Sequence, residues 1–141
     1  MAVGCHAAVQ ALATIKSNID SGAFKAIQFA AIEALTGPQA QVTENNAIYA
    51  ERRDILYDGL KSLGWKFDKP KATFYMWVPV PKKETSASFA KKLLEKCGIL
   101  VVPGSGYGKY GEGYVRFAIT LPKERILEAI ARLKTNKQSR A

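Results

Sequence analysis

The sequence predicts an α/β chain in an α+β arrangement. Two helices and a long connecting helix come first, followed by a small mixed or antiparallel sheet with helices packed on one face. Up to residue 63, apolar residues recur at intervals of three, four and seven, which is the period of helices. After Pro70 the order of apolar patterns becomes β-α-β-β-α. The chain has 141 residues, 48% of them hydrophobic, which is enough for one packed core.

Two helices are expected in the first part of the chain, over residues 7–17 and 23–35. Residues 18–22 are Asn, Ile, Asp, Ser and Gly, a composition that favours a loop between the two helices. The second helix carries apolar residues on most of its surface, so we expect it to pack on more than one side. Gly37 and Pro38 end it.

A long amphipathic helix is expected next, over residues 39–63, because its apolar residues repeat at helical spacing. At 1.5 Å per residue, a helix of this length spans about 35 Å. Such a length suits a connector between two bodies, and Gly64 ends the helix. Its apolar face comprises Ile48, Ile55, Leu56, Leu60 and Leu63.

Three strands are expected in the last part of the chain. The first, residues 73–80, is β-branched and aromatic and stops at a Pro-Val-Pro run. The second, residues 99–102, is a short apolar run that we expect to be buried, and the third, residues 114–120, alternates in polarity. The segment between the last two, residues 103–113, is rich in glycine and is expected to be a mobile or tightly turned loop.

Two further helices complete this part. Ser86 or Ser88 is suited to cap a helix that runs to Cys97, because a serine hydroxyl accepts a hydrogen bond from the first turn. Pro122 opens the last helix. The residues after Thr135 are polar and are expected to fray.

The formal net charge of +9 raises the question of nucleic-acid binding. The basic residues are scattered along residues 82–140, mostly on the expected solvent faces of helices. No RNP-like, KH-like or zinc-knuckle pattern is present. A basic surface without specific nucleic-acid binding is favoured, and a basic α/β nucleic-acid-binding or protein-interaction module stays as the alternative.

Three features indicate a cytoplasmic location without a membrane partner. No apolar stretch approaches the ~20 residues that a membrane-spanning helix needs. The first residues lack the basic start and apolar run of a signal peptide. Cys5 and Cys97 lie far apart, which does not indicate a disulfide framework.

Three short motifs resemble functional signatures but lack the required context. Gly106, Gly108 and Gly111 match G-x-G-x-x-G, yet the pattern that follows is a strand, whereas a dinucleotide site needs a helix there. Ser88-Phe-Ala-Lys matches S-x-x-K without the partner motifs of serine acylases. His6, the only histidine, adjoins a cysteine, and two adjacent residues do not make a metal site. We therefore expect no nucleotide site and no metal.

Arg116 lies in the middle of an apolar strand, where a charge is costly to bury unless it meets a partner. Alternation places it on the face opposite Val115 and Phe117. One interpretation is an arginine exposed on a wet sheet face. The other is a carboxylate receptor, because a guanidinium holds a carboxylate through two parallel hydrogen bonds.

Taken together, four segments resemble the C-terminal region of the class I/II pyridoxal-phosphate-dependent aminotransferases, which have fold type I. They are residues 16–28, 72–77, 103–108 and 112–120. The first segment is most similar to the branch that contains the LL-diaminopimelate and aspartate aminotransferases. The resemblance covers essentially the whole chain, in order and at family-like spacing.

The resemblance implies that Arg116 binds the α-carboxylate of the substrate, with Tyr75 and Gly106 as secondary contacts. It implies transfer of an amino group between an amino acid and a 2-oxo acid, with pyridoxal 5'-phosphate as cofactor. The turn at Ser21 and Gly22 matches a segment near the dimer interface of relatives, so a homodimer is expected.

The resemblance also divides the chain into parts. Residues 1–43 correspond to the end of the large cofactor-binding domain, and residues 44–63 to the long interdomain helix. Residues 64–136 correspond to the C-terminal small domain, and residues 137–141 form a tail.

The family's cofactor-binding lysine lies, by this resemblance, just upstream of the point where the sequence begins. The arginine, aspartate and aromatic residues that hold the cofactor elsewhere in the family have no match here either. The resemblance therefore implies no catalytic and no cofactor-binding residue in this chain. Taken alone, the chain is expected to be an inactive C-terminal fragment that does not bind the cofactor covalently.

Overall fold

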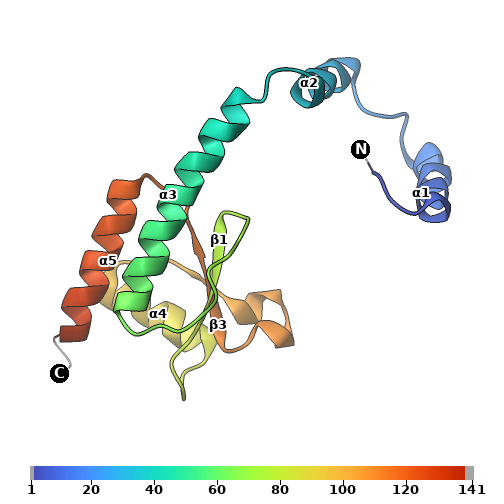
Figure 1. Cartoon of the computed structure of the whole chain (residues 1–141). Coiled ribbons are helices and arrows are strands. Elements are labelled where there is room, and N and C mark those ends of the chain that lie inside the picture. Colours follow the sequence, from blue (N-terminus) through green and yellow to red (C-terminus); the bar gives the residue numbers. More distant parts are fainter. Residues whose placement is uncertain (1, 139–141) are drawn as a thin grey trace. The chain divides into compact units, whose positions relative to one another are not determined.

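The computed structural model describes residues 2–138 and divides into two units, with the boundary between Gln41 and Val42 (Figure 1). The first unit contains two helices, α1 (His6–Ile19) and α2 (Lys25–Thr36). Helix α1 extends two residues beyond the predicted end, into the expected loop. It does so because the backbone N–H of Asp20 still donates to the carbonyl oxygen of Lys16, at 3.0 Å.

Neither helix of the first unit has a buried residue. The expectation that the second helix packs on more than one side is therefore wrong for the described chain. Its large apolar side chains are all more than half exposed: Ile27, Phe29, Ile32 and Leu35.

The second unit contains most of the long helix and all of the sheet. Its elements are α3 (Ala40–Ser62), which begins just before the boundary, β1 (Tyr75–Pro79), α4 (Ser86–Cys97), β2 (Val102–Pro103), the 3₁₀ turns η1 (Gly104–Tyr107) and η2 (Lys109–Gly111), β3 (Tyr114–Ala118) and α5 (Lys123–Gln138). Among residues 2–138, no helix is both long enough and apolar enough to cross a membrane.

The sheet has three strands in the order β1-β3-β2, and both pairings are antiparallel. Strand β3 is central, so Arg116 lies opposite Trp77 on one side and Val102 on the other. Of the two arrangements allowed by the sequence, mixed and antiparallel, the structure has the antiparallel one.

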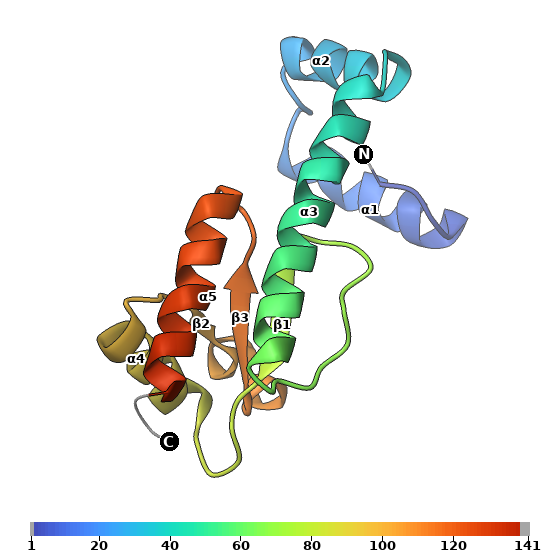
Figure 2. The same cartoon turned by 60° about the vertical axis from the view of Figure 1, so that its left-hand side comes forward.

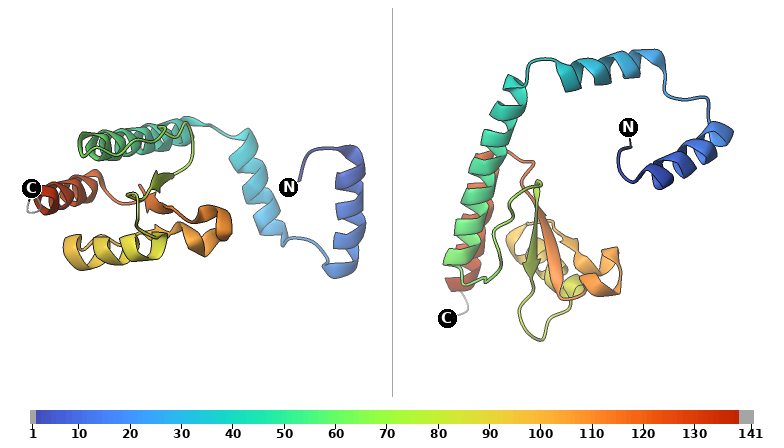
Figure 3. Two further views of the ribbon diagram at one scale, coloured as in Figure 1. Left: turned by 90° about the horizontal axis from the view of Figure 1, so that it is seen from below. Right: turned by 45° about the vertical axis from the view of Figure 1, so that its right-hand side comes forward.

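Three helices cover one face of this sheet. Seen from below, α3, α5 and α4 form an arc on one side of the strands (left panel of Figure 3). Helices α3 and α5 run beside each other in Figures 1 and 2. Gly59 permits this close approach, because an added Cβ there would lie 2.4 Å from Cδ1 of Ile130. The core comprises side chains of the sheet and all three helices: Leu56, Leu60, Met76, Val78, Phe89, Leu93, Cys97, Val101, Val115, Phe117, Ile119, Ile126, Ile130 and Leu133.

The strand predicted over residues 99–102 is shorter than expected and begins only at Val102, and Val101 is buried beside it. Gly98 adopts a left-handed conformation with φ of 63° and ends α4, and the N–H of Ile99 then donates back to Leu93. The chain meets β3 only at Val102, so β2 is two residues long, and Leu100 is 81% exposed.

Two helix ends also differ from expectation. The cap of α4 is Thr85, whose hydroxyl accepts from the N–H of Ser88 at 3.1 Å while Ser88 Oγ accepts from the N–H of Thr85. The last helix does not end at Thr135 but continues to Gln138. In this last turn, the side-chain amide of Asn136 donates to the carbonyl oxygen of Lys96 on α4. Residues 139–141 of the predicted tail lie outside the described residues.

Candidate functional site

The face of the sheet that the helices leave uncovered carries an arginine among aromatic rings. Because side chains alternate along a strand, residues next to the buried ones point to the other face. We call this group the open face. It comprises Tyr75 and Trp77 from β1, Tyr114 and Arg116 from β3, and Tyr107 from η1.

Arg116 is half-buried and lies against two tyrosine rings. Its Cζ is 3.9 Å from the ring centroid of Tyr75 and 4.9 Å from that of Tyr107. Both distances are within the range of cation–π contacts. The planar guanidinium carries five N–H donors, which lie in its plane. Within residues 2–138, no hydrogen bond or ion pair occupies these donors.

The other two aromatic residues of the open face, Trp77 and Tyr114, contact each other. The rings of Trp77 and Tyr114 are stacked, with centroids 5.6 Å apart and planes 19° apart. Trp77 also meets Tyr107 edge to face at 5.7 Å. Such pairs contribute beyond the area that they bury. The strand register places Trp77 directly opposite Arg116.

The glycine-rich segment is tightly turned, in agreement with one of the two predicted conformations. Two consecutive 3₁₀ turns bring Gly104 and Gly111 together, so a Cβ added at either would lie 2.0 Å from the carbonyl oxygen of the other. Gly108, between the turns, has φ of 101°, which an L side chain rarely adopts. The G-x-G-x-x-G motif leads into strand β3 and not into a helix, as expected.

A fully buried serine ties this segment to helix α4. Ser86 Oγ accepts from the N–H groups of Gly113 at 2.9 Å and Tyr114 at 3.2 Å. The N–H of Ser86 in turn donates to Oε1 of Glu112 at 2.7 Å. This N–H lowers the pKa of the Glu112 carboxyl, because the hydrogen bond favours the charged form. The sequence predicts Ser86 or Ser88 as a helix cap, and the contacts of Ser86 with residues 26–28 positions away carry no local signal.

The structure brings together two of the three predicted site residues. Tyr75 and Arg116 are in contact. Gly106 belongs to the same turn as Tyr107, but a Cβ added there would meet no atom within 4 Å, so it faces open space. The sequence missed Tyr107 and Tyr114 as members of the site. Period-two alternation already places Tyr114 beside Arg116, whereas Tyr107 reaches the face only through the turn.

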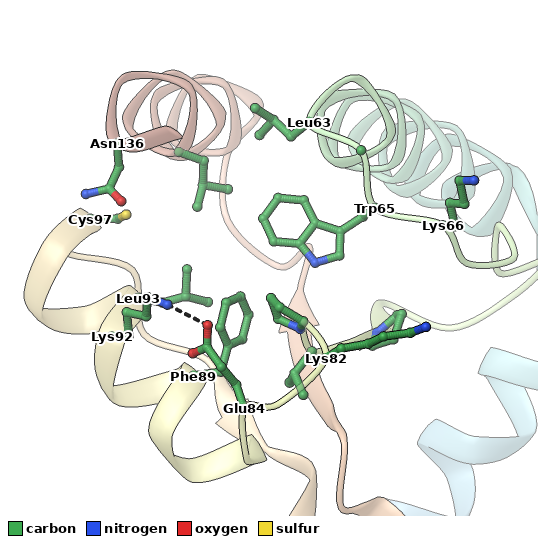
Figure 4. A pocket seen from close by; sticks show the side chains of 15 residues that line it. Leu63, Trp65, Lys66, Lys82, Glu84, Phe89, Lys92, Leu93, Cys97 and Asn136 are labelled. Carbon is green, nitrogen blue, oxygen red and sulfur yellow. Dashed lines mark hydrogen bonds and ion pairs between the residues drawn. The ribbon is translucent and has the colours of Figure 1, made fainter. Parts of the chain in front are cut away.

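A hollow lies on the helix-covered side of the unit and is shown in Figure 4. It has a volume of about 800 Å³, and the rings of Trp65 and Phe89 point into it. Its carboxylate, Glu84, forms an ion pair with Lys92, and Lys66 and Lys82 point away from the centre. Apolar lining with a satisfied ion pair offers no convergent chemistry, so the open face is the better candidate site.

The side chains of the open face suit a carboxylate and do not suit covalent attachment of pyridoxal phosphate. That cofactor requires a lysine amine for its aldehyde, and the five members of the face include no lysine. Among the described residues, no group of three or more histidine, cysteine, aspartate or glutamate side chains is placed to hold a metal ion.

Comparison with known proteins identifies the class. The family described as "Aminotransferase class I and II" matches residues 1–133, and the chain belongs to this family. The predicted resemblance to this family is thereby confirmed.

Two curated relatives are named LL-diaminopimelate aminotransferase. The one from Moorella thermoacetica is 61% identical over 126 residues, which cover 89% of this chain and 32% of the relative. One from Dehalococcoides mccartyi is 50% identical over 139 residues, covering 99% of this chain and 36% of the relative. The chain thus spans about a third of the length of these relatives.

Solved structures show the same fold. A probable N-succinyldiaminopimelate aminotransferase from Thermus thermophilus superposes with a TM-score of 0.85 at 30% identity, over 95% of this chain and 36% of that one. An aminotransferase from Staphylococcus aureus gives a TM-score of 0.82 at 31% identity, over 90% of this chain and 34% of that one.

Proposed function

We propose that this chain supplies the substrate-carboxylate site of a pyridoxal-phosphate-dependent aminotransferase. The enzyme would transfer an amino group between an amino acid and a 2-oxo acid. One observation carries the proposal: Arg116 is held by two tyrosine rings while its N–H donors have no protein partner in the described chain. A planar fork of donors matches a planar carboxylate.

The carboxylate is the group that every substrate of such a reaction shares. In this proposal Arg116 binds it in both halves of the reaction, with Tyr75 and the turn at Gly106 as secondary contacts. Binding the carboxylate fixes the position of the neighbouring carbon, where the proton must move. The names of the relatives support diaminopimelate as the amino acid.

Cofactor binding and proton transfer are assigned to the remaining two thirds of the enzyme. When bound, pyridoxal phosphate supplies the electron sink that makes the amino acid's α-proton removable. The present chain contributes neither its lysine nor its phosphate contacts in this proposal. The 141 residues alone are therefore expected to be inactive and to form no covalent adduct with the cofactor.

The domain assignment and the assembly are part of the same proposal. Residues 1–43 would complete a large domain, residues 44–63 would link it to the small domain of residues 64–136, and residues 137–141 would form a tail. The exposed apolar side chains of α2 support burial against further protein, either the rest of the chain or a second subunit. A cytoplasmic homodimer without specific nucleic-acid binding is proposed.

The proposal is tested with a chimera that joins the upstream two thirds of the Moorella thermoacetica relative to this chain. We expect the chimera to bind pyridoxal phosphate and to transaminate LL-diaminopimelate, while the 141-residue chain does neither. The variant Arg116→Ala should retain the cofactor absorbance and lose most of the activity. A folded, cofactor-loaded chimera whose activity is unchanged by Arg116→Ala would refute the assignment.

A further inference from the structure

We infer that Tyr107 is a positioning residue, which holds the guanidinium of Arg116 so that its N–H edge is presented to a substrate carboxylate. This inference rests on the proposed function of Arg116. Tyr107 does not contact the reacting atoms in this account, and it acts through the arginine alone.

The position of the Tyr107 ring is the first reason. Its centroid is 4.9 Å from Arg116 Cζ, and its edge-to-face contact with Trp77 limits its own rotation. Tyr110, three residues along the same segment, has neither contact: it is 88% exposed, and among residues 2–138 its ring faces only Lys109, at 5.0 Å. The segment therefore places one of its two tyrosines on the arginine and leaves the other in solvent.

The backbone that carries Tyr107 is fixed from both ends, which is the second reason. Gly104 begins η1 and lies against the backbone of Gly111. On the far side of that contact, Glu112 accepts the N–H of Ser86, the first residue of α4. A ring on a turn held in this way loses little further freedom when it stacks on the guanidinium.

The physical consequence concerns the plane of the guanidinium. An arginine side chain has many rotamers, and all but one of them are lost when two parallel hydrogen bonds form. The Tyr107 ring, 4.9 Å from Arg116 Cζ, limits the positions that the guanidinium can take, and no hydrogen bond in the described chain occupies the N–H donors of Arg116. The contact belongs to the aromatic ring and not to the hydroxyl, so phenylalanine should replace tyrosine here.

The first test uses the 141-residue chain and the NMR signals of the Arg116 side chain. Tyr107→Ala should move the δ-methylene and Nε–H signals toward their positions in an unstructured peptide, because a ring current is removed. Tyr107→Phe should leave them close to wild type, and the matched control Tyr110→Ala should leave them unchanged. Equal, small shifts for Tyr107→Ala and Tyr110→Ala would overturn the contact on which the inference depends.

The second test uses the chimera and separates KM from kcat. Tyr107→Ala should raise KM for both the amino acid and the oxo acid by about 3- to 30-fold, the range expected for loss of one cation–π contact. Its kcat at saturation should change less, Tyr107→Phe should restore KM, and Tyr110→Ala should have no effect. A KM for Tyr107→Ala equal to that of Tyr110→Ala would overturn the inference.

The two proposals fail in different ways. If Arg116→Ala abolishes activity and Tyr107→Ala leaves KM unchanged, the carboxylate site stands and the positioning role is wrong. If Arg116→Ala has no effect, the site itself is wrong, and no result with Tyr107 rescues it.

Discussion

The two faces of one small sheet are built from the same two strands and have opposite roles. On the helix side, Met76, Val78 and Val115 are 0% exposed. On the other side, their neighbours Trp77 and Tyr114 are 39% and 37% exposed and share the face with Arg116, which has no charged partner among the described residues. Burial therefore stabilises the first face, whereas the N–H donors of Arg116 on the second face have no protein partner among the described residues.

Truncation of a side chain on the buried face should lower the free energy of unfolding most. Met76→Ala removes a fully buried side chain and leaves a cavity, so it should lower the free energy of unfolding by about 2–5 kcal/mol. Urea denaturation of the 141-residue chain measures this. Trp77→Ala, one residue along the same strand, is the matched control and should cost less; a larger loss for Trp77→Ala would reverse the assignment of the two faces.

The hydrogen bonds that join Ser86 of α4 to the glycine-rich segment are the next point to test. Ser86→Ala removes the hydroxyl that accepts from Gly113 and Tyr114, leaving two N–H groups without that partner. We expect a loss of about 1–3 kcal/mol in the free energy of unfolding. Ser88→Ala, at an exposed position of the same helix, should cost less, and equal losses would show that Ser86 acts only through the helix end.

The hydrogen bond from Ser86 to Glu112 should make the free energy of unfolding dependent on pH. The N–H of Ser86 lowers the pKa of Glu112 in the folded state from its ordinary value of 4.5. The charged carboxylate therefore contributes fully to the stability of the folded state above pH 4.5. The contribution is lost as the pH falls through the folded pKa. Glu112→Gln should therefore be less stable than wild type at pH 7, and the difference should shrink toward pH 3. A difference that is independent of pH would show that the charge of Glu112 is irrelevant.

A substitution of Arg116 on the open face should change the free energy of unfolding least. Arg116→Lys in the 141-residue chain should change the free energy of unfolding by no more than about 0.5 kcal/mol, because the guanidinium is only half-buried and its N–H groups make no hydrogen bond in the described structure. Urea denaturation beside Met76→Ala measures the contrast. A loss as large as that of Met76→Ala would show that Arg116 is a structural residue.

The sequence alone predicted those parts of the molecule that depend on a repeating pattern. Helical spacing located α3 closely, and alternation along β3 placed Arg116 opposite Val115 and Phe117. The cap of α4 was not predictable, because Thr85 and two serines nearby are all competent and only the turn geometry selects among them.

Features that depend on distant contacts were not predictable. Tyr107 reaches Arg116 through two successive 3₁₀ turns, whose shape is set by the approach of Gly104 and Gly111. The short strand β2 depends on where the chain meets β3 after the left-handed Gly98, and local composition does not encode that meeting point.

The carboxylate role of Arg116 is tested most directly by comparing two substrates in the chimera. One is LL-diaminopimelate, and the other is the corresponding diamine, which lacks both α-carboxylates. Arg116→Lys should reduce kcat/KM for the amino acid by about 30- to 1,000-fold, equivalent to about 2–4 kcal/mol, and leave that for the amine unchanged. An equal loss for both substrates, or no loss for the amino acid, would contradict the account.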